Sequence, residues 1–238
     1  MLENVGQKIE IADYTCHIFS KGTDIPYRVI YWLMGAHEAD FLHKMKEYLD
    51  RNAERSSWRL VAVEISDWNQ QLSPWQAPAV FGGETFAGRG RHTLQVLQDK
   101  IIPRIEADLV DNMPQNRIIG GYSLAGLFSL WAFYESGSFG SVASCSGSLW
   151  YPGWVEYLKQ HTASENSMVY LSLGTKEEKT KNPVMAQVGE GTRKTYQMLC
   201  RDMQITQKIL EWNPGGHFTR PLERMAGGFL WLLNQGKK

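Results

Sequence analysis

The sequence predicts an α/β fold in which helices cover both faces of a mainly parallel sheet. Six short apolar runs, rich in Val, Ile and aromatic residues, alternate along the chain with segments typical of helices. Strands that alternate with helices in this way pair in parallel, and the helices then lie on the faces of the sheet. Ligand sites in such sheets lie beyond the carboxyl ends of the strands. We therefore look for functional residues directly after each predicted strand.

The elements follow in chain order from these runs. The predicted strands span residues 28–34, 59–65, 117–119, 141–145, 168–173 and 205–212. The predicted helices span residues 39–53, 92–109, 124–135, 183–204 and 222–234. No repeat and no linker divides the chain, so we expect a single domain over residues 1–238.

Residues 67–91 interrupt the alternation, because they show no clear period. They carry four aromatic side chains, Trp68, Trp75, Phe81 and Phe86. A long aromatic loop between regular elements favours a functional role, and Trp75 is therefore a candidate substrate-binding residue. The alternative is a surface loop that its aromatic side chains hold in place.

The composition argues against several classes of partner and cofactor. Twenty-five basic and 25 acidic residues cancel, so no net field favours nucleic acid or an anionic membrane. No apolar stretch approaches the roughly 20 residues of a membrane span, and the N-terminus lacks the pattern of a secretory signal. The three cysteines form no CxxC pair, which argues against a disulfide scaffold or a cysteine metal site. We expect a soluble protein of the reducing cytoplasm, with no metal and no cofactor.

Residues 117–127, RIIGGYSLAGL, are typical of a buried strand, a tight turn and a buried helix. A serine at such a turn is held on strained backbone, and its hydroxyl points out of the sheet. Ser123 occupies that position and is the predicted nucleophile. Small residues are needed two positions to either side; Gly121 meets this need, and Ala125 replaces the glycine of the usual GxSxG pattern. The alternative is an ordinary glycine-rich turn that contains a serine.

The serine needs a histidine to remove its proton and a carboxylate to orient that histidine. In the chain order serine, acid, histidine, His217 is the predicted base, because it follows the last predicted strand in a Gly-Gly loop. The acid should follow the strand at 168–173, where Glu177 is the first choice and Glu178 the second. The alternatives are a solvated charge run, KEEK, and a serine–histidine pair without an acid.

Two backbone N–H donors are needed for the oxyanion of a tetrahedral intermediate. One should come from Leu124, the residue after the nucleophile. The other should come from the loop after the first predicted strand, where Ala36 is the first choice and His37 the next. Arg89 lies at the start of the second predicted helix, where it could attract an anionic part of a substrate. The alternative for Arg89 is a solvated side chain at a helix-entry turn.

Five blocks of sequence, taken in order, carry a family resemblance. They are DWNQQLSPW (67–75), IIPRIEADL (101–109), GGYSLAGLFSLWAFYESGSFG (120–140), SCSGSLWY (144–151) and GGHFTRPLERMAGGFLWL (215–232). Through these blocks the chain resembles the esterase D / enterochelin esterase-like family of the α/β-hydrolase superfamily, from about Pro26 to the C-terminus. The resemblance implies an α/β-hydrolase fold, with Ser123 as nucleophile and His217 as base. It also implies that Ser148-Leu149-Trp150 edges the active site, which makes Trp150 a candidate substrate-binding residue.

The chain departs from the family pattern at three places. Ala125 replaces the usual glycine, Met34-Gly35-Ala36 replaces a frequent His-Gly-Gly oxyanion loop, and Gly147 replaces a proline. The second departure bears on which residue supplies the second oxyanion donor. The N-terminus is also short compared with siderophore esterases that carry an extra N-terminal domain, so we expect no such domain here.

Taken together, these residues predict a serine esterase that hydrolyses a small-molecule ester through an acyl-enzyme intermediate. The aromatic loop and Trp150 favour an aromatic or siderophore-like acyl group. Two alternatives remain open. An acyltransferase would use the same serine and histidine, and a catalytically silent binding protein would keep the α/β-hydrolase fold without using them. The oligomeric state is left open.

Overall fold

The computed structural model describes residues 6–22, 27–53, 57–80, 82–109 and 116–235. Its main sheet has eight strands in the order β1-β2-β4-β3-β7-β8-β9-β10. They are β1 (Gln7–Ile11), β2 (Tyr14–Lys21), β3 (Tyr27–Gly35), β4 (Ser57–Ile65), β7 (Asn116–Tyr122), β8 (Ser141–Cys145), β9 (Ser167–Gly174) and β10 (Ile205–Asn213). All neighbouring strands from β4 to β10 pair in parallel, and β2 pairs antiparallel with β1 and β4. The predicted mainly parallel sheet is confirmed.

All six predicted strands lie in this sheet, and the one predicted at 141–145 coincides with β8. The strands β1 and β2 are not among those predicted from the sequence. In β2 the buried side chains of Tyr14, Cys16 and Phe19 are separated by half-exposed ones, so the strand has no continuous apolar run. Antiparallel strands with one solvated face have this pattern, whereas the central parallel strands are buried on both faces.

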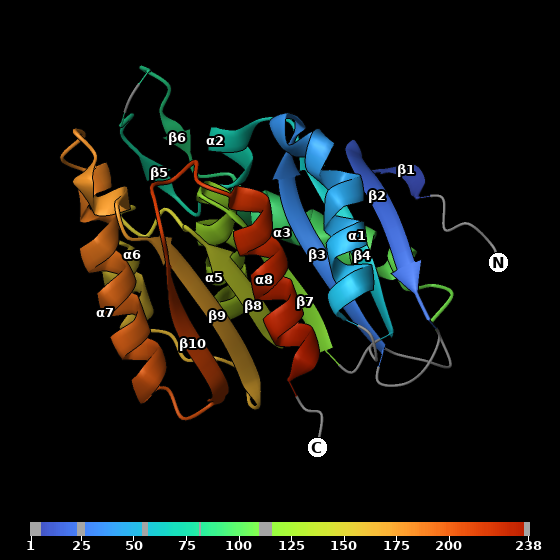
Figure 1. The fold of residues 1–238 in the computed structure, drawn as a ribbon. Coiled ribbons are helices and arrows are strands. Elements are labelled where there is room, and N and C mark those ends of the chain that lie inside the picture. The colour runs from blue at the N-terminus through green and yellow to red at the C-terminus, as the bar shows by residue number, and fades with distance from the viewer. Residues whose placement is uncertain (1–5, 23–26, 54–56, 81, 110–115, 236–238) are drawn as a thin grey trace.

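Helices cover the sheet on both faces, because both faces of its central strands are apolar. Six successive side chains of β3 are fully buried and alternate between the faces: Val29, Ile30, Tyr31, Trp32, Leu33 and Met34. Helices α1 (Leu42–Asn52) and α8 (Pro221–Asn234) cover one face, which is the near face in Figure 1. Helices α3 (Gly90–Val96), α5 (Leu124–Glu135) and α7 (Val188–Arg201) contribute to the apolar cluster on the other face.

Shorter elements complete the described chain. They are η1 (Ala36–Phe41), α2 (Trp68–Gln71), β5 (Gln76–Ala77), β6 (Phe86–Ala87), η2 (Leu97–Ile101), α4 (Ile102–Ile105), α6 (Trp154–Leu158), η3 (Glu177–Lys179) and η4 (Met185–Gln187). Two predicted helices begin with such elements, since the 3-10 turns η1 and η4 precede α1 and α7. In the described ranges, no helix is both long enough and apolar enough to cross a bilayer.

The prediction of a single helix over residues 92–109 is wrong. The segment forms α3, then a π-helical turn, η2, and then α4, which ends at Ile105. Pro103 lies in this segment and has no N–H to donate, so the regular hydrogen bond back to Asp99 is lost. A π-helical turn re-spaces the backbone around such a break.

Residues 67–91 are also more ordered than a plain loop, since they contain α2 and the β5–β6 pair. The side chain of Asp67 caps α2 by accepting a hydrogen bond from the Gln70 N–H at 3.2 Å. Figure 1 shows α2, β5 and β6 beyond the end of the sheet at which the parallel strands finish. Phe81, one of the four aromatic residues of this segment, lies outside the described residues. The segment is thus placed where ligand sites of parallel sheets lie.

Candidate active site

Ser123 occupies a strained turn between β7 and α5. Its backbone has φ 59° and ψ −122°, a conformation that is unfavourable for a residue with a side chain. Three hydrogen bonds hold this backbone: Ser123 N–H donates to the Cys145 carbonyl at 3.1 Å, and the Ser123 carbonyl accepts from Leu127 N–H at 3.1 Å and Ser148 N–H at 3.0 Å. The strained conformation is therefore imposed by the surrounding strands and helix.

Gly121 explains how the turn accepts Ala125. A Cβ added at Gly121 would lie 2.6 Å from the Cβ of Ala125 and 3.1 Å from the Leu33 carbonyl oxygen. Strand and helix therefore approach so closely that only one of the two positions can carry a methyl group. The departure from the GxSxG pattern at Ala125 is tolerated because Gly121 leaves the space.

Glu177 and His217 lie beside each other at the same end of the sheet. Glu177 begins η3, just after β9, and His217 lies in the loop after β10. The Nδ1 atom of His217 is 2.7 Å from Oε2 of Glu177. The Tyr122 hydroxyl also donates to the main-chain carbonyl of His217 at 2.6 Å, which fixes the loop over β7. The acid expected after β9 and the base expected after β10 are brought together, although 40 residues separate them.

The carboxylate of Glu177 is buried and fully engaged. Its Oε1 accepts hydrogen bonds from the Ser146 hydroxyl at 2.7 Å, the Gly174 N–H at 2.7 Å and Arg224 Nη1 at 2.9 Å. Burial raises the pKa of Glu177, but its hydrogen bond to His217, the charge of His217 and the other donors outweigh burial and hold the pKa below its usual value. An ionised carboxylate only accepts, so Nδ1 of His217 carries a proton and Nε2 is left as the acceptor.

Arg224, on α8, joins the acid to the histidine loop. Besides its contact with Glu177, its Nη2 donates to the Pro214 and Gly216 carbonyls, both at 3.1 Å. The side chain is 3% exposed, so its charge requires a buried partner. Arg224 is not among the site residues predicted from the sequence. A signal for it exists, however, because this arginine stands on the otherwise apolar buried face of a helix.

Ser123 and His217 line one cavity, which we name the Ser123 pocket. Its volume is about 390 Å³. Its apolar walls include five aromatic side chains, Phe41, Trp68, Phe86, Trp150 and Phe218. An adjoining cavity of about 310 Å³ is lined by Ser123, Glu177 and His217 among others. Nucleophile, base and acid candidates therefore border one continuous site with largely apolar walls.

The first choices for the two oxyanion donors, Leu124 and Ala36, each open a helix. Leu124 lines the Ser123 pocket and opens α5, so its N–H has no acceptor within the helix. Ala36 opens η1 and is in the same situation. The N–H of Gly35 is already used, since it donates to Oε2 of Glu38 at 3.0 Å. Of the two residues predicted to supply the second donor, His37 lines the Ser123 pocket and Ala36 is not among its lining residues.

The three predicted substrate-binding residues have different outcomes. Trp150 lines the Ser123 pocket. Trp75 does not: its indole N–H donates to the Pro152 carbonyl at 2.8 Å, and its ring packs against Tyr151 and Tyr157. Arg89 does not line the pocket either, and it is exposed at the start of α3. The walls come instead from Trp68 and Phe86 of the same segment, because its α2 and β6 place these two rings over the sheet end.

Glu178, the second choice for the acid, lies at the surface. Its carboxylate forms a bidentate pair with Arg193, with distances of 2.9 and 3.0 Å. No hydrogen bond or ion pair joins Glu178 to His217 among the residues that the structure describes. In the described part of the chain, no group of three or more His, Cys, Asp or Glu side chains is placed to hold a metal ion.

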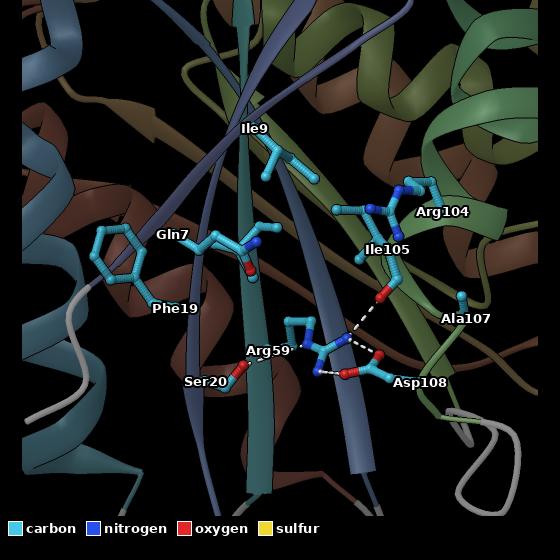
Figure 2. Close-up of a pocket in the computed structure, with 10 residues that line it drawn as sticks. Gln7, Ile9, Phe19, Ser20, Arg59, Arg104, Ile105, Ala107 and Asp108 are labelled. Atoms are coloured by element: carbon cyan, nitrogen blue, oxygen red, sulfur yellow. Dashed lines mark hydrogen bonds and ion pairs between the residues drawn. The ribbon is translucent and has the colours of Figure 1, made fainter. Parts of the chain in front are cut away.

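A further cavity of about 330 Å³ lies toward the amino end of β4, and Figure 2 shows its lining residues. Its main polar feature is Arg59, which pairs with Asp108 at 2.7 and 2.9 Å and donates to Ser20 and the Ile105 carbonyl. None of the described residues that line it is a histidine or a cysteine. It offers no nucleophile–base pair, so the Ser123 pocket is the candidate active site.

Comparison with known proteins identifies the family of the chain. The model of the family described as Putative esterase matches residues 8–219. The chain belongs to this esterase family. No curated protein matches the chain in sequence.

Several solved structures share the fold of this esterase. The siderophore hydrolase EstA from Aspergillus nidulans is 16% identical with a TM-score of 0.75, over 98% of this chain and 94% of that one. An IroE-like serine hydrolase from Shewanella oneidensis is 14% identical with a TM-score of 0.78, over 96% and 80%. The enterochelin esterase from Shigella flexneri is 17% identical with a TM-score of 0.67, over 96% and 58%. The expected α/β-hydrolase fold and the resemblance to enterochelin esterases are confirmed.

Proposed function

We propose that this esterase is a serine hydrolase in which Ser123 is the nucleophile, His217 the general base and Glu177 the orienting acid. The observation that carries the proposal is the 2.7 Å hydrogen bond between His217 and Glu177 at a pocket that Ser123 also lines. A histidine in this arrangement has the tautomer that leaves Nε2 able to accept a proton. All three residues extend from one sheet, and we propose that residues 1–238 form one catalytic domain.

The reaction has two halves. In the first, Ser123 Oγ attacks the ester carbonyl carbon while Nε2 of His217 takes the hydroxyl proton. The N–H groups of Leu124 and Ala36 donate to the oxyanion, and His217 then returns the proton to the leaving alcohol. In the second half, water attacks the acyl-enzyme, gives its proton to His217, and releases the carboxylic acid as Ser123 regains its hydrogen. Throughout, the ionised Glu177 stabilises the protonated imidazole.

For the substrate we propose an ester with an aromatic group. The Ser123 pocket is walled by the rings of Trp68, Phe86 and Trp150, and flat rings pack well against such walls. Structures with the same fold include siderophore hydrolases and a ferulic acid esterase, which fits this substrate class. A panel of aryl and alkyl esters tests it, and a preference for short alkyl acyl groups would contradict it.

A fluorophosphonate probe tests the chemistry directly. It should label Ser123 at neutral pH, and the labelled peptide should be identified by mass spectrometry. Ser123→Ala and His217→Ala should each lower kcat by at least about 10³-fold while the circular dichroism spectrum is unchanged. Ser136→Ala, on a surface turn after α5, is the matched control and should keep normal turnover. A folded protein that leaves Ser123 unmodified would be a silent binding protein, and the proposal would be wrong.

The compartment that we propose is the reducing cytoplasm. All three cysteines are free thiols, with Cys16 and Cys145 buried and Cys200 exposed. An exposed free thiol persists most readily where glutathione and thioredoxin keep thiols reduced. Fractionation of cells that express the full chain, followed by blotting, checks this expectation.

A further inference from the structure

One carboxyl group in the wall of the Ser123 pocket has no role in the proposed mechanism. Glu38, in η1, is 3% exposed and lines the pocket together with Ser123. Its Oε2 accepts the Gly35 N–H at 3.0 Å, and the nearest ring nitrogen, Nε2 of His37, is 4.0 Å away. No described residue donates a hydrogen bond to its Oε1. A carboxyl oxygen is thus left for a group that enters the pocket.

No permanently charged cation in the described part of the pocket wall balances this group. Among the described residues that line the Ser123 pocket and its adjoining cavity, none is a lysine or an arginine. Glu177, the other carboxylate at the site, does have a charged partner, because Nη1 of the buried Arg224 lies 2.9 Å from its Oε1. Arg220 lies in the loop beyond His217, but it is exposed and pairs with Glu223 at 3.1 Å. An ionised Glu38 therefore sets a negative potential in a cavity with largely apolar walls, where charges act more strongly than in water.

Resting on the proposed esterase function, we propose that Glu38 selects the charge of the substrate, admitting uncharged and cationic esters and rejecting anionic ones. Its Oε1 accepts a hydrogen bond from a hydroxyl or ammonium group of the substrate. An anionic group beside it meets like charge without a counterion, and entry is disfavoured. Among aromatic esters, those with neutral phenolic groups are admitted. An ester that carries a metal-loaded catecholate has negative charge and is excluded.

The protonation state of Glu38 sets the conditions for a test. Burial raises the pKa of its carboxyl group to about 7, while the Gly35 hydrogen bond acts in the opposite direction. The group is mostly ionised at pH 8.5 and mostly protonated at pH 6. The other titratable side chains that face the pocket are His37 on the same element and His217 and Tyr122 across it. Burial raises the pKa of Tyr122 to about 12, above the range of the test. A ratio of rates for two substrates at one pH cancels their common effect on catalysis.

The test uses three p-nitrophenyl esters of similar size and different charge. The acyl groups are 5,5-dimethylhexanoate (neutral), 4-(trimethylammonio)butyrate (cationic) and 4-sulfobutyrate (anionic). At pH 8.5 the wild-type kcat/KM for the anionic ester should be at least about tenfold below that for the neutral ester. Glu38→Gln keeps an oxygen for the Gly35 N–H but removes the charge, and it should narrow this gap to about threefold or less. Glu47→Gln on α1, which removes one exposed charge away from the pocket, should leave the gap unchanged.

The outcomes separate this proposal from the proposed function. Labelling of Ser123 and hydrolysis of the neutral ester would support the esterase proposal. With that established, the role of Glu38 alone is overturned if wild type hydrolyses the anionic ester as well as the neutral one. It is also overturned if Glu38→Gln leaves the difference in kcat/KM between these two esters unchanged. If Ser123 is not labelled, the esterase proposal fails and the selection proposal falls with it. If Glu38→Gln does not fold, the pH dependence of the wild-type protein alone tests the role of Glu38. Its gap between neutral and anionic esters must shrink from pH 8.5 to pH 6, and a constant gap overturns the proposal.

Discussion

At the scale of single residues, the site depends on how one carboxylate is held. Glu177 is buried and engaged by a hydroxyl, a backbone N–H, a guanidinium and an imidazole. Each of these donors favours the ionised form, which explains a pKa below the usual value despite burial. Because the charged form persists at neutral pH, the proton on His217 stays on Nδ1. Glu177 therefore acts by fixing which ring nitrogen of His217 carries the proton.

Glu177→Gln tests this at the residue scale. The amide keeps the size of the side chain but can donate to Nδ1, which would move the histidine proton to Nε2 and block its role as base. We expect kcat to fall by about 10³–10⁴-fold with the fold retained, as measured with a neutral aryl ester. Glu178→Gln, at the adjacent surface position, is the control and should stay within about twofold of wild type. A loss smaller than tenfold in Glu177→Gln would assign catalysis to a serine–histidine pair alone.

At the scale of elements, the approach of β7 and α5 shapes the turn. The strand ends and the helix begins on either side of Ser123, and the absence of a side chain at Gly121 leaves space for the methyl group of Ala125. Helix α5 is apolar on all sides, with ten of its residues buried, so it cannot move away without exposing its core face. The strain at Ser123 is maintained by this packing rather than by local preference.

Gly121→Ala should destabilise the protein by about 1–3 kcal/mol, because the added methyl group meets the Cβ of Ala125 at 2.6 Å. Adding Ala125→Gly should restore part of the loss, giving a coupling energy measurable by urea unfolding in a double-mutant cycle. The restoration stays partial, since the Leu33 carbonyl lies 3.1 Å from the same methyl position. Gly137→Ala, where the nearest atom is 3.9 Å away, is the neutral control. Strict additivity of the two substitutions would refute the proposed close contact.

At the scale of the whole molecule, two buried carboxyl groups at one site titrate with opposite effects on stability. The pKa of Glu177 is lowered in the folded state, so its contribution is present above its unfolded pKa and is lost as pH falls. The pKa of Glu38 is raised to about 7, so its contribution is present at low pH and is lost as pH rises toward that value. The ionised Glu38 that we propose for selectivity therefore lowers global stability, as functional groups often do.

The free energy of unfolding tests this balance. Between pH 5 and pH 8, the Glu38 carboxyl should reduce the stability of the wild type by about 2–3 kcal/mol, a decline that Glu38→Gln should lack. Urea denaturation of both proteins across this range gives the difference, in which all other titrating groups cancel. Glu47→Gln should follow the wild-type curve. Parallel pH profiles for wild type and Glu38→Gln would show that Glu38 is ionised throughout.

The sequence predicts the strands, helices and turns that depend on neighbouring residues, but few of the contacts between distant residues. The strand at 141–145 and the helix at 124–135 match β8 and α5 because continuous apolar runs and a turn with small residues are local signals. The β1–β2 hairpin was missed because its burial alternates. Trp75 was selected as a pocket residue and Trp68 was not, because the direction of each ring depends on α2 and the β5–β6 pair.

By itself, then, the sequence determined the parallel α/β sheet, the strained turn at Ser123, and the positions after β9 and β10 where partners were to be sought. Only the tertiary structure decided that Glu177 rather than Glu178 meets His217, that Arg224 contacts both Glu177 and the loop that carries His217, and that Glu38 lines the Ser123 pocket. The reason is physical. Periodicity and turn chemistry are set by neighbours along the chain, whereas the contact of side chains 40 and 47 residues apart is set by how helices pack on the sheet.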